Sequence, residues 1–464
     1  MLAPRVLLSS LLLLGPLGHW PLVTACALYW PPTELADNTS CAVVAVDPAR
    51  HMGRILLPNR YNATTGGVTV FAPIFSSLPL IGLGSSAHAT GAALPPADKI
   101  THAIILVHGL AGDANSYFCD GVAATAAAGA TDTTIVIAPW FGSQQVTADQ
   151  WSSGAAAADS LARDARGTPI SISSFWDSSR WLKGGDNSPR PERFTTSFDV
   201  IDAVVETLRA QRQNGWLPNL GQISIAGFSA GAQLVSRWAA FSPVPGVRTI
   251  AGDGSSYMYL DKRRPAAACN ALANTGAAHT CATFAPPPAA AAAACPNFDF
   301  YKFGIGNLTQ AAEDNMYIGQ IKSADEVVQR FMAKDARFIL GTQDVCNCNS
   351  PAFTNDRSLC YPRGTTCSPD ATGGQVAGVS CCDTWPDTGS NNALATYCEA
   401  MLMGTNRLQR GLNYVDYLRT VAAEHHLDGK VTADPWPKYA LFDGGHDNKA
   451  FYSSPAFRSW VFGG

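Results

Sequence analysis

Residues 223–231 read Ile-Ser-Ile-Ala-Gly-Phe-Ser-Ala-Gly, and this stretch decides the fold. A short apolar run leads into the pentapeptide Gly-x-Ser-x-Gly, and residues 230–240 follow with helical spacing. A strand, a tight turn and a helix in this order lift the serine hydroxyl out of the sheet. Gly227 and Gly231 suit the turn because a Cβ atom there would collide with neighbouring backbone. The stretch therefore predicts that Ser229 is a nucleophile.

The composition limits the classes of partner. The chain has 464 residues, 47% hydrophobic and 15% charged, with a formal net charge of −4. This length allows one large hydrophobic core or two domains. The charge is nearly balanced and no Lys/Arg run occurs, so nucleic acid and anionic membrane surfaces are poor candidate partners. The Ala-rich tract 289–294 is interpreted as part of an exposed loop.

The first 27 residues have the pattern of a secretory signal peptide. Arg5 supplies positive charge, residues 6–14 are apolar, and the small residues Ala25 and Ala27 suit cleavage. The alternative is an uncleaved membrane anchor, but Gly and Pro residues within 15–18 interrupt the apolar run. We therefore expect a secreted protein without a membrane span after cleavage.

Three further sequence features bear on the secretory route. Residues 23–26 resemble a bacterial lipidation site, whereas Asn-x-Ser/Thr sequons at Asn38, Asn62 and Asn307 suit a eukaryotic route and a glycoprotein. Cleavage removes Cys26 and leaves twelve of the thirteen cysteines, an even number that agrees with disulfide formation outside the cytosol.

The Cys pattern does not favour a metal. A zinc site at Cys346-x-Cys348 and Cys381-Cys382 is the alternative to disulfides, but no paired C-x-x-C or His spacing accompanies them. We expect neither a metal nor an organic cofactor.

Strand-like and helix-like segments alternate from about residue 100 to the end. This alternation predicts an α/β fold with a mainly parallel central sheet and helices on both faces. Residues 28–98 are rich in Pro, Gly and Ser and are interpreted as an N-terminal extension packed on the domain 99–464. The predicted strands are 103–107, 133–137, 223–226, 247–251, 337–340 and 439–442, and the predicted helices are 198–211, 230–240, 408–423 and part of 448–461.

Two long stretches, 254–334 and 345–406, interrupt the alternation. Each begins just past the carboxyl end of a predicted strand, where ligands bind in open α/β sheets. We predict that these two insertions form a Cys-rich cap over the site. The alternative is passive decoration held by disulfides.

A serine nucleophile needs a base, which we expect far downstream of it. Only His425, His426 and His446 of the nine histidines lie there. His425 and His426 fall at the end of a helical stretch, where we expect solvated or capping side chains. His446 lies in a Gly-rich loop after the predicted strand 439–442, so His446 is favoured as the base over a loop histidine without a role.

The base in turn needs a carboxylate, which should follow an earlier strand. The predicted strand 337–340 leads into Gly-Thr-Gln-Asp, which makes Asp344 the candidate acid. Asp253, after the preceding strand, is the second choice. A surface turn residue is the alternative interpretation of Asp344. A buried carboxylate at this place would hold the tautomer of the imidazole and stabilise the imidazolium.

An oxyanion formed during acyl transfer needs two backbone N–H donors. Ala230, directly after the nucleophile, should supply one. The loop after the predicted strand 103–107 reads His-Gly-Leu-Ala-Gly, and Leu110 in this loop should supply the other. The pentapeptide, this loop and a strand-end Asp and His in the right order together predict a serine hydrolase.

With these residues in place, the chain resembles the α/β-hydrolase superfamily from about residue 100 to its end. Within it, the chain is similar to secreted hydrolases related to polyhydroxyalkanoate-depolymerase-like esterases. The stretches that carry the resemblance are HGLAGDANSYF at 108–118, ISIAGFSAGAQLVSRWA at 223–239, SSYMYLD at 255–261, GTNRLQRGLNYVDYL at 404–418 and GGHDNKAFYSS at 444–454.

The resemblance implies the same roles as the residue pattern. Ser229, Asp344 and His446 fall on the nucleophile, acid and base positions of the superfamily, and Leu110 and Ala230 fall on its oxyanion donors. Two departures stand out. Phe228 replaces the His or Tyr that is frequent beside the nucleophile, which implies a more apolar wall. A Cys-rich insertion directly after the acid is also unusual.

These patterns predict a secreted serine hydrolase that cleaves carboxylic esters through a Ser-His-Asp triad and an acyl-enzyme. Its substrate would be a small-molecule or polymeric ester. Within enzymes, a serine peptidase or a polyester depolymerase remains open, because fold does not choose between them. The alternative from another class is a non-catalytic secreted binding or adhesion protein.

Cysteine parity gives one more expectation. The first insertion holds Cys269, Cys281 and Cys295, the second holds seven cysteines, and Cys41 and Cys119 remain. Because both insertions carry odd numbers, each must send at least one bridge outside itself if all twelve are paired. The simplest arrangement joins the two insertions and pairs Cys41 with Cys119.

Overall fold

The computed structural model describes residues 52–57, 69–78, 97–142, 171–176, 179–187, 195–270, 281–342, 344, 398–404, 406–425 and 436–463. The predicted signal peptide, Cys41 and the cysteines at 346–382 lie outside these ranges. No helix within them is long and apolar enough to cross a membrane.

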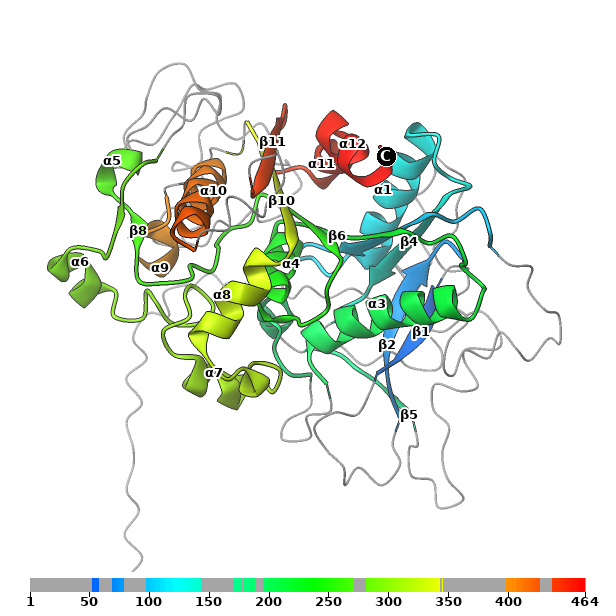
Figure 1. Ribbon diagram of the computed structural model, residues 1–464, viewed down its shortest axis with the longest axis horizontal. Coiled ribbons are helices and arrows are strands. Elements are labelled where there is room, and N and C mark those ends of the chain that lie inside the picture. The colour runs from blue at the N-terminus through cyan, green and yellow to red at the C-terminus, as the bar shows by residue number, and fades with distance from the viewer. Residues whose placement is uncertain are drawn as a thin grey trace, which may run out of the picture.

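A single large sheet organises the described residues (Figure 1). Strand β2 is antiparallel to both of its neighbours in the strand order, and all pairs from β4 onward are parallel. This arrangement confirms the predicted mainly parallel sheet of an α/β-hydrolase fold. The order across the sheet is β1 (Met52–Leu57), β2 (Thr69–Ser76), β4 (Thr134–Pro139), β3 (His102–Val107), β6 (Gln222–Phe228), β7 (Arg248–Gly252), β10 (Asp335–Gly341) and β11 (Lys438–Phe442), with β5 (Ser171–Ser173) paired to β2.

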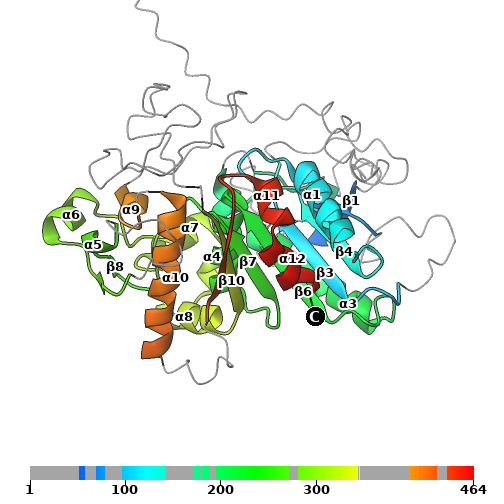
Figure 2. The ribbon, with the colours of Figure 1, turned by 90° about the horizontal axis from the view of Figure 1, so that it is seen from above.

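The two faces of the sheet are covered by different helices, as the layers in Figure 2 show. Side chains alternate along β3, so Ile105 and Val107 enter one core while Ile104 and Leu106 enter the other. Helices on both faces confirm the predicted layering. The first core includes α3 (Ser197–Gln213), α4 (Ala230–Phe241), α8 (Ala324–Met332) and α10 (Arg407–Glu424), and the second includes α1 (Ala114–Ala127), α11 (Asn448–Ser453) and α12 (Pro455–Phe462).

Local signals explain where several helices begin. The Thr196 side chain and Asp199 form a capping box at the start of α3. Ser454 caps α12, which begins with Pro455 at a position where the missing N–H costs nothing. The side chain of Asn406 accepts the amide of Gln409 and so fixes the start of α10 close to the sheet.

The segment 28–98 contributes two strands to the sheet itself. The edge strand β1 pairs in antiparallel register with β2, and β2 pairs with β4 through residues 74–76. These strands extend the sheet beyond the parallel pairs that carry the candidate site.

The first insertion contains short elements that the sequence pattern did not reveal. The Ala-rich tract was expected to be loop, and this is wrong: it forms α6 (Ala289–Ala294), because Ala has the highest helix propensity. None of its residues is buried, so the expected exposure is correct. The other short elements are β8 (Arg264–Pro265), α5 (Ala267–Asn270), β9 (Phe284–Ala285), α7 (Leu308–Asp314) and the 3₁₀ turn η7 (Ile318–Gln320).

Disulfides link the insertions. Cys269 pairs with Cys281 inside the first insertion, and Cys295 pairs with Cys398 at the start of α9 (Cys398–Met401). The second bridge confirms the expected connection between the two insertions, and α5, α6, β8 and α9 gather at one end of the molecule (Figure 1). Cys119 is also disulfide-bonded, and its partner is outside the described residues, so its pairing with Cys41 stays a prediction.

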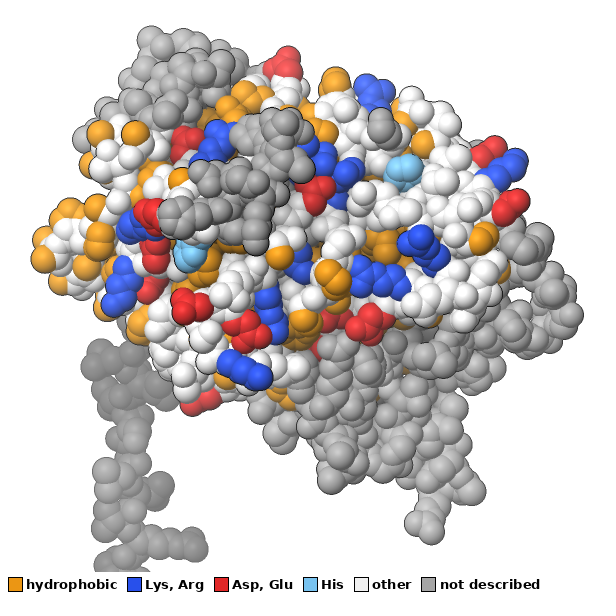
Figure 3. All heavy atoms as spheres, in the orientation of Figure 1, with side chains coloured by type: hydrophobic (Ala, Val, Ile, Leu, Met, Phe, Trp, Pro, Cys, Tyr) orange, Lys and Arg blue, Asp and Glu red, His pale blue; other side chains and the backbone are white. Residues whose placement is uncertain are grey.

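The surface mixes charges of both signs. On the face drawn in Figure 3, Lys and Arg side chains are interspersed with Asp and Glu side chains among the described residues. This distribution is in line with the small net charge of −4.

Candidate active site

The turn between β6 and α4 holds Ser229 in a strained conformation. Its φ is 57° and its ψ is −115°, in the positive-φ region that non-glycine residues rarely adopt. Its amide donates to the carbonyl of Gly252 on β7 at 2.8 Å, which anchors the turn to the neighbouring strand. This conformation matches the strand–turn–helix geometry that the sequence pattern predicts around Ser229.

Glycine is required on both sides of this serine. A Cβ on Gly227 would lie 2.4 Å from the backbone carbon and oxygen of Gly231, and a Cβ on Gly231 would lie 2.1 Å from the Val107 oxygen. Both distances are far below van der Waals contact, so only glycine lets α4 pack this closely on β3 and β6.

Three side chains from distant parts of the chain meet at the carboxyl ends of parallel strands. His446 Nε2 lies 2.8 Å from Ser229 Oγ, and His446 Nδ1 lies 2.6 Å from Asp344 Oδ2. Ser229 follows β6, Asp344 follows β10 and His446 follows β11. The structure thus brings together the three residues that the sequence pattern selected.

The alternative residues do not take the places of the base or the acid. His425 is an exposed residue at the carboxyl end of α10, and His426 is outside the described residues. Asp253 is buried at the end of β7, but its carboxylate oxygens accept the amide of Gly341, at 3.0 and 3.1 Å, instead of contacting the imidazole.

The carboxyl group of Asp344 is buried, with 2% of its side chain exposed, yet its surroundings favour the charged form. Burial alone would raise the pKa of Asp344, but His446 and then Arg407 outweigh it and hold this pKa below its usual value. Arg407 Nη1 lies 3.4 Å from Asp344 Oδ1. A buried anion with two such partners can orient the imidazole and stabilise its protonated form.

The imidazole of His446 is set up as a neutral base. Burial and then the charge of Arg407 lower the pKa of His446 below its usual value, and Asp344 opposes them only in part. A lowered pKa keeps the ring unprotonated at neutral pH, so Nε2 can accept the Ser229 proton. Phe228 packs 4.8 Å from the imidazole ring centre, which provides the apolar wall that the sequence predicted.

Sequence reasoning missed Arg407. This residue opens α10, is 2% exposed, and also donates from Nε to Ser255 Oγ at 3.2 Å. Its sequence context, a helix start in a stretch that carries the family resemblance, does not distinguish it from a surface arginine. Only the packing of α10 against the end of β10 shows that its charge faces Asp344.

The loop after β3 approaches the elbow from the other side. Within the described residues, no carbonyl or side chain accepts the Leu110 amide, and the Ala230 amide belongs to the first turn of α4, where helical N–H groups lack partners. The Leu110 side chain is 42% exposed. Among the described residues, neither predicted oxyanion donor has another acceptor outside the first turn of α4.

His108 holds this loop in shape. Its Nδ1 donates to the carbonyl of Gly109 at 2.8 Å, and its Nε2 accepts the amide of Phe141 at 3.0 Å, so the ring is neutral. Burial lowers the pKa of His108 to about 4, which keeps it so. The Trp181 ring packs 4.6 Å away. His108 therefore supports the loop and does not compete for the role of base.

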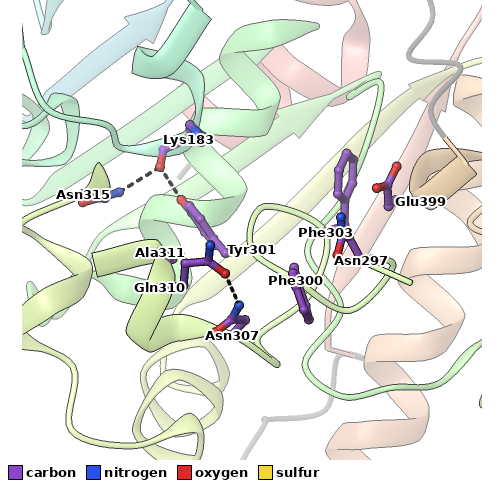
Figure 4. A pocket seen from close by; sticks show the side chains of 10 residues that line it. All are labelled: Lys183, Asn297, Phe300, Tyr301, Phe303, Asn307, Gln310, Ala311, Asn315 and Glu399. Carbon is purple, nitrogen blue, oxygen red and sulfur yellow. Dashed lines mark hydrogen bonds between the residues drawn. The ribbon is translucent and has the colours of Figure 1, made fainter. Parts of the chain in front are cut away.

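A separate cavity of about 310 Å³ lies between the first insertion, Lys183 and Glu399 (Figure 4). None of the five candidate residues lines it. Several of its polar side chains already have partners: Tyr301 and Asn315 both donate to the backbone carbonyl of Lys183, and Asn307 donates to the Gln310 side chain at 2.6 Å. The cavity therefore has no visible part in the chemistry at Ser229.

Two groups of side chains in the described ranges have the spacing of metal ligands. One contains Cys295 and Cys398, which are consumed by their disulfide. The other contains Asp253, Asp344 and His446. Both nitrogens of His446 already have hydrogen-bond partners, so this cluster is better described as a hydrogen-bonded network than as a metal site.

Comparison with known proteins gives distant structural matches. No family model and no curated protein matches the chain. Poly(aspartic acid) hydrolase-1 from Sphingomonas sp. KT-1 is similar at 16% identity, with 89% of this chain and 98% of that chain covered and a TM-score of 0.41. A poly(3-hydroxybutyrate) depolymerase from Bordetella parapertussis is similar at 14% identity, with 94% and 96% covered and a TM-score of 0.41.

An S-formylglutathione hydrolase from Staphylococcus aureus is similar at 12% identity, with 89% of this chain and 98% of that chain covered and a TM-score of 0.33. Because these scores and identities are low, the assignment of the fold rests on the strand order and the elbow described above.

Proposed function

We propose that the chain is a secreted serine hydrolase that cleaves carboxylic esters through an acyl-enzyme. One observation carries the proposal: Ser229, His446 and Asp344 form a continuous chain of hydrogen bonds at 2.8 and 2.6 Å. This is the arrangement that activates a serine hydroxyl. The two disulfides between described cysteines and the predicted signal peptide support the secretory route.

The geometry suits a two-step reaction. Ser229 Oγ attacks the ester carbonyl while His446 Nε2 takes its proton, and the amides of Leu110 and Ala230 hold the oxygen as it becomes negative. His446 then returns the proton to the departing alcohol. A water molecule, deprotonated by the same imidazole, attacks the acyl-enzyme, and the imidazolium then returns this proton to Ser229 Oγ as the acid departs.

The insertions 254–334 and 345–406 are proposed to form a cap beside this site. The second insertion begins directly after Asp344, and the Cys295–Cys398 bridge ties it to the first. A cap tied in this way would select substrates by their shape as they reach Ser229. The preference for esters over peptides or polyesters rests on the family resemblance, since all three reactions use the same triad.

The proposal is tested by hydrolysis assays on wild type and Ser229→Ala. The panel contains nitrophenyl esters of increasing acyl length, a polyester and a peptide. Wild type should turn over at least one ester, and Ser229→Ala should be inactive while still folded. Ser236→Ala is a matched control in α4, the helix that follows Ser229, where among the described residues Oγ donates to the carbonyl of Gln233. Equal activity in Ser229→Ala and wild type would contradict the mechanism, and an inert wild type would favour a binding protein.

A further inference from the structure

A second buried carboxyl group, that of Asp253, lies beside the triad and has no role in the mechanism above. It follows β7, and it is 0% exposed. Its φ of 47° lies in the left-handed region, where Asp is tolerated but strained. A strained, buried polar residue at a catalytic centre is a reason to look for a function.

The backbone of Gly341 joins Asp253 to the acid of the triad. The Gly341 amide donates to both oxygens of Asp253, at 3.0 and 3.1 Å, and the Gly341 carbonyl accepts the amide of Asp344 at 3.1 Å. A Cβ at position 341 would lie 2.9 Å from Asp253 Oδ2. The end of β10 is thus fitted closely to the Asp253 carboxyl group.

The two carboxyl groups compete for one positive charge. One ligand atom each from Asp253, Asp344 and His446 lies within 4.8 Å of the others. Two buried carboxylates this close do not both stay ionised. Arg407 bonds Asp344, and the His446 nitrogen also faces Asp344, so the negative charge belongs on Asp344.

The other groups that face Asp253 agree with this division of charge. Tyr257, from the segment after β7, is buried and neutral, and its hydroxyl supplies no compensating charge. Burial and then the charge of Asp344 raise the pKa of Asp253 well above its usual value, although Gly341 and Arg407 act in the opposite direction.

We propose that Asp253 is a positioning residue: a neutral carboxylic acid that accepts the Gly341 amide and donates its own proton in a hydrogen bond to the Asp344 carboxylate. The inference rests on the proposed function. Held from one side by Asp253 and from another by Arg407, the Asp344 carboxylate has one orientation, the one that points Oδ2 at His446 Nδ1.

The test compares Asp253→Asn and Asp253→Ala in the full-length protein through the pH dependence of kcat/KM for a nitrophenyl ester. Asn keeps an oxygen for Gly341 and an N–H donor for Asp344, and it carries no charge, so it imitates the neutral acid. We expect the kcat/KM of Asp253→Asn to stay within about threefold of the wild-type value, and the acidic limb of its pH profile to stay in place. Asp253→Ala loses the hydrogen bonds to both Gly341 and Asp344, so its kcat/KM should fall roughly tenfold to hundredfold.

An ionised Asp253 would give a different result. Asp253→Asn would then remove a negative charge near His446 and move the acidic limb down by about one pH unit or more. Asp447→Asn is the matched control, because the charge of Asp447 raises the pKa of His446 and Asn preserves the cap of α11. The acidic limb should move down in Asp447→Asn and stay in place in Asp253→Asn.

Several outcomes would overturn the inference: a shifted acidic limb in Asp253→Asn, full activity in Asp253→Ala, or an Asp253→Asn protein that is inactive or does not fold. If Asp253→Ala fails to fold, the position of the acidic limb in Asp253→Asn still decides whether Asp253 is neutral or ionised. Labelling with a fluorophosphonate probe distinguishes failure of this inference from failure of the proposed function. If wild type is labelled at Ser229 but the limb shifts, only the role of Asp253 fails, whereas an unlabelled wild type refutes the proposed function as well.

Discussion

Replacing Gly231 by Ala tests whether the fit of α4 against β3 sets the geometry for catalysis. The added Cβ would lie 2.1 Å from the Val107 oxygen and 2.8 Å from the His108 oxygen. Since such contacts are essentially never shorter than 3.0 Å, the two segments must separate by about 0.9 Å, the difference between 3.0 and 2.1 Å. The proposed oxyanion donors lie one on each segment, Ala230 on α4 and Leu110 in the loop after β3.

The displacement should cost more in activity than in stability. A misplacement of about 1 Å in catalytic geometry can cost about 100-fold, so we expect kcat/KM of Gly231→Ala to fall by about that factor. Overpacking costs about 1–3 kcal/mol, and the higher helix propensity of Ala returns about 1 kcal/mol. The free energy of unfolding should therefore fall by only about 0–2 kcal/mol.

The assay is ester hydrolysis under kcat/KM conditions together with urea unfolding of the same samples. Gly221→Ala is the matched control, because a Cβ there meets only ordinary contacts at 3.8 and 4.0 Å. Activity of Gly231→Ala within threefold of wild type would refute the reasoning, since the clash would then be absorbed without moving the two donors.

Other predictions concern the triad, its charges and the disulfides. Asp344→Asn should lose about four orders of magnitude in kcat, as in the serine-protease precedent, while fluorescence and circular dichroism stay native; a loss below tenfold would remove Asp344 from the mechanism. Because the pKa of His446 is lowered and the base must be neutral, kcat/KM should fall only below about pH 6.5, the usual His pKa, as acid is added. Arg407→Gln should move this acidic limb to higher pH, because the charge of Arg407 lowers the pKa of His446. An acidic limb that stays in place would contradict this role of Arg407. Removing the Cys295–Cys398 bridge with Cys295→Ser/Cys398→Ser should lower the free energy of unfolding by about 4.7 kcal/mol, because this bridge closes a loop of 103 residues. Removing the Cys269–Cys281 bridge in the same way should lower it by about 3 kcal/mol, because its loop spans 12 residues. Equal losses in urea unfolding would contradict this ranking.

The parts of the fold that the sequence predicted are those with a strong local pattern. The strand before Ser229 and the helix after it were predicted to within about two residues, because an apolar run, two glycines and helical spacing mark them. The order of serine, acid and histidine along the chain, together with their strand-end positions, was enough to select three residues that lie in contact.

The parts that escaped prediction depend on contacts between distant segments. Arg407 was not singled out and Asp253 was named only as the second-choice acid, because each has the local sequence of an ordinary helix start or turn. Their importance follows from the burial of their side chains beside Asp344, which only the packing of α10 and β7 around β10 reveals. The helix at 289–294 was missed for a different reason: an all-Ala tract has no hydrophobic periodicity, although its propensity is high.

Labelling with a fluorophosphonate probe, followed by peptide mapping, tests the central claim most directly. Such a probe reacts with a serine only where a base and an oxyanion site activate it. The account predicts a single adduct on the peptide containing Ser229, with none in Ser229→Ala and much slower labelling in a His446→Ala protein. An unlabelled wild type, or an adduct on another serine, would contradict the claim that Ser229 is the activated nucleophile.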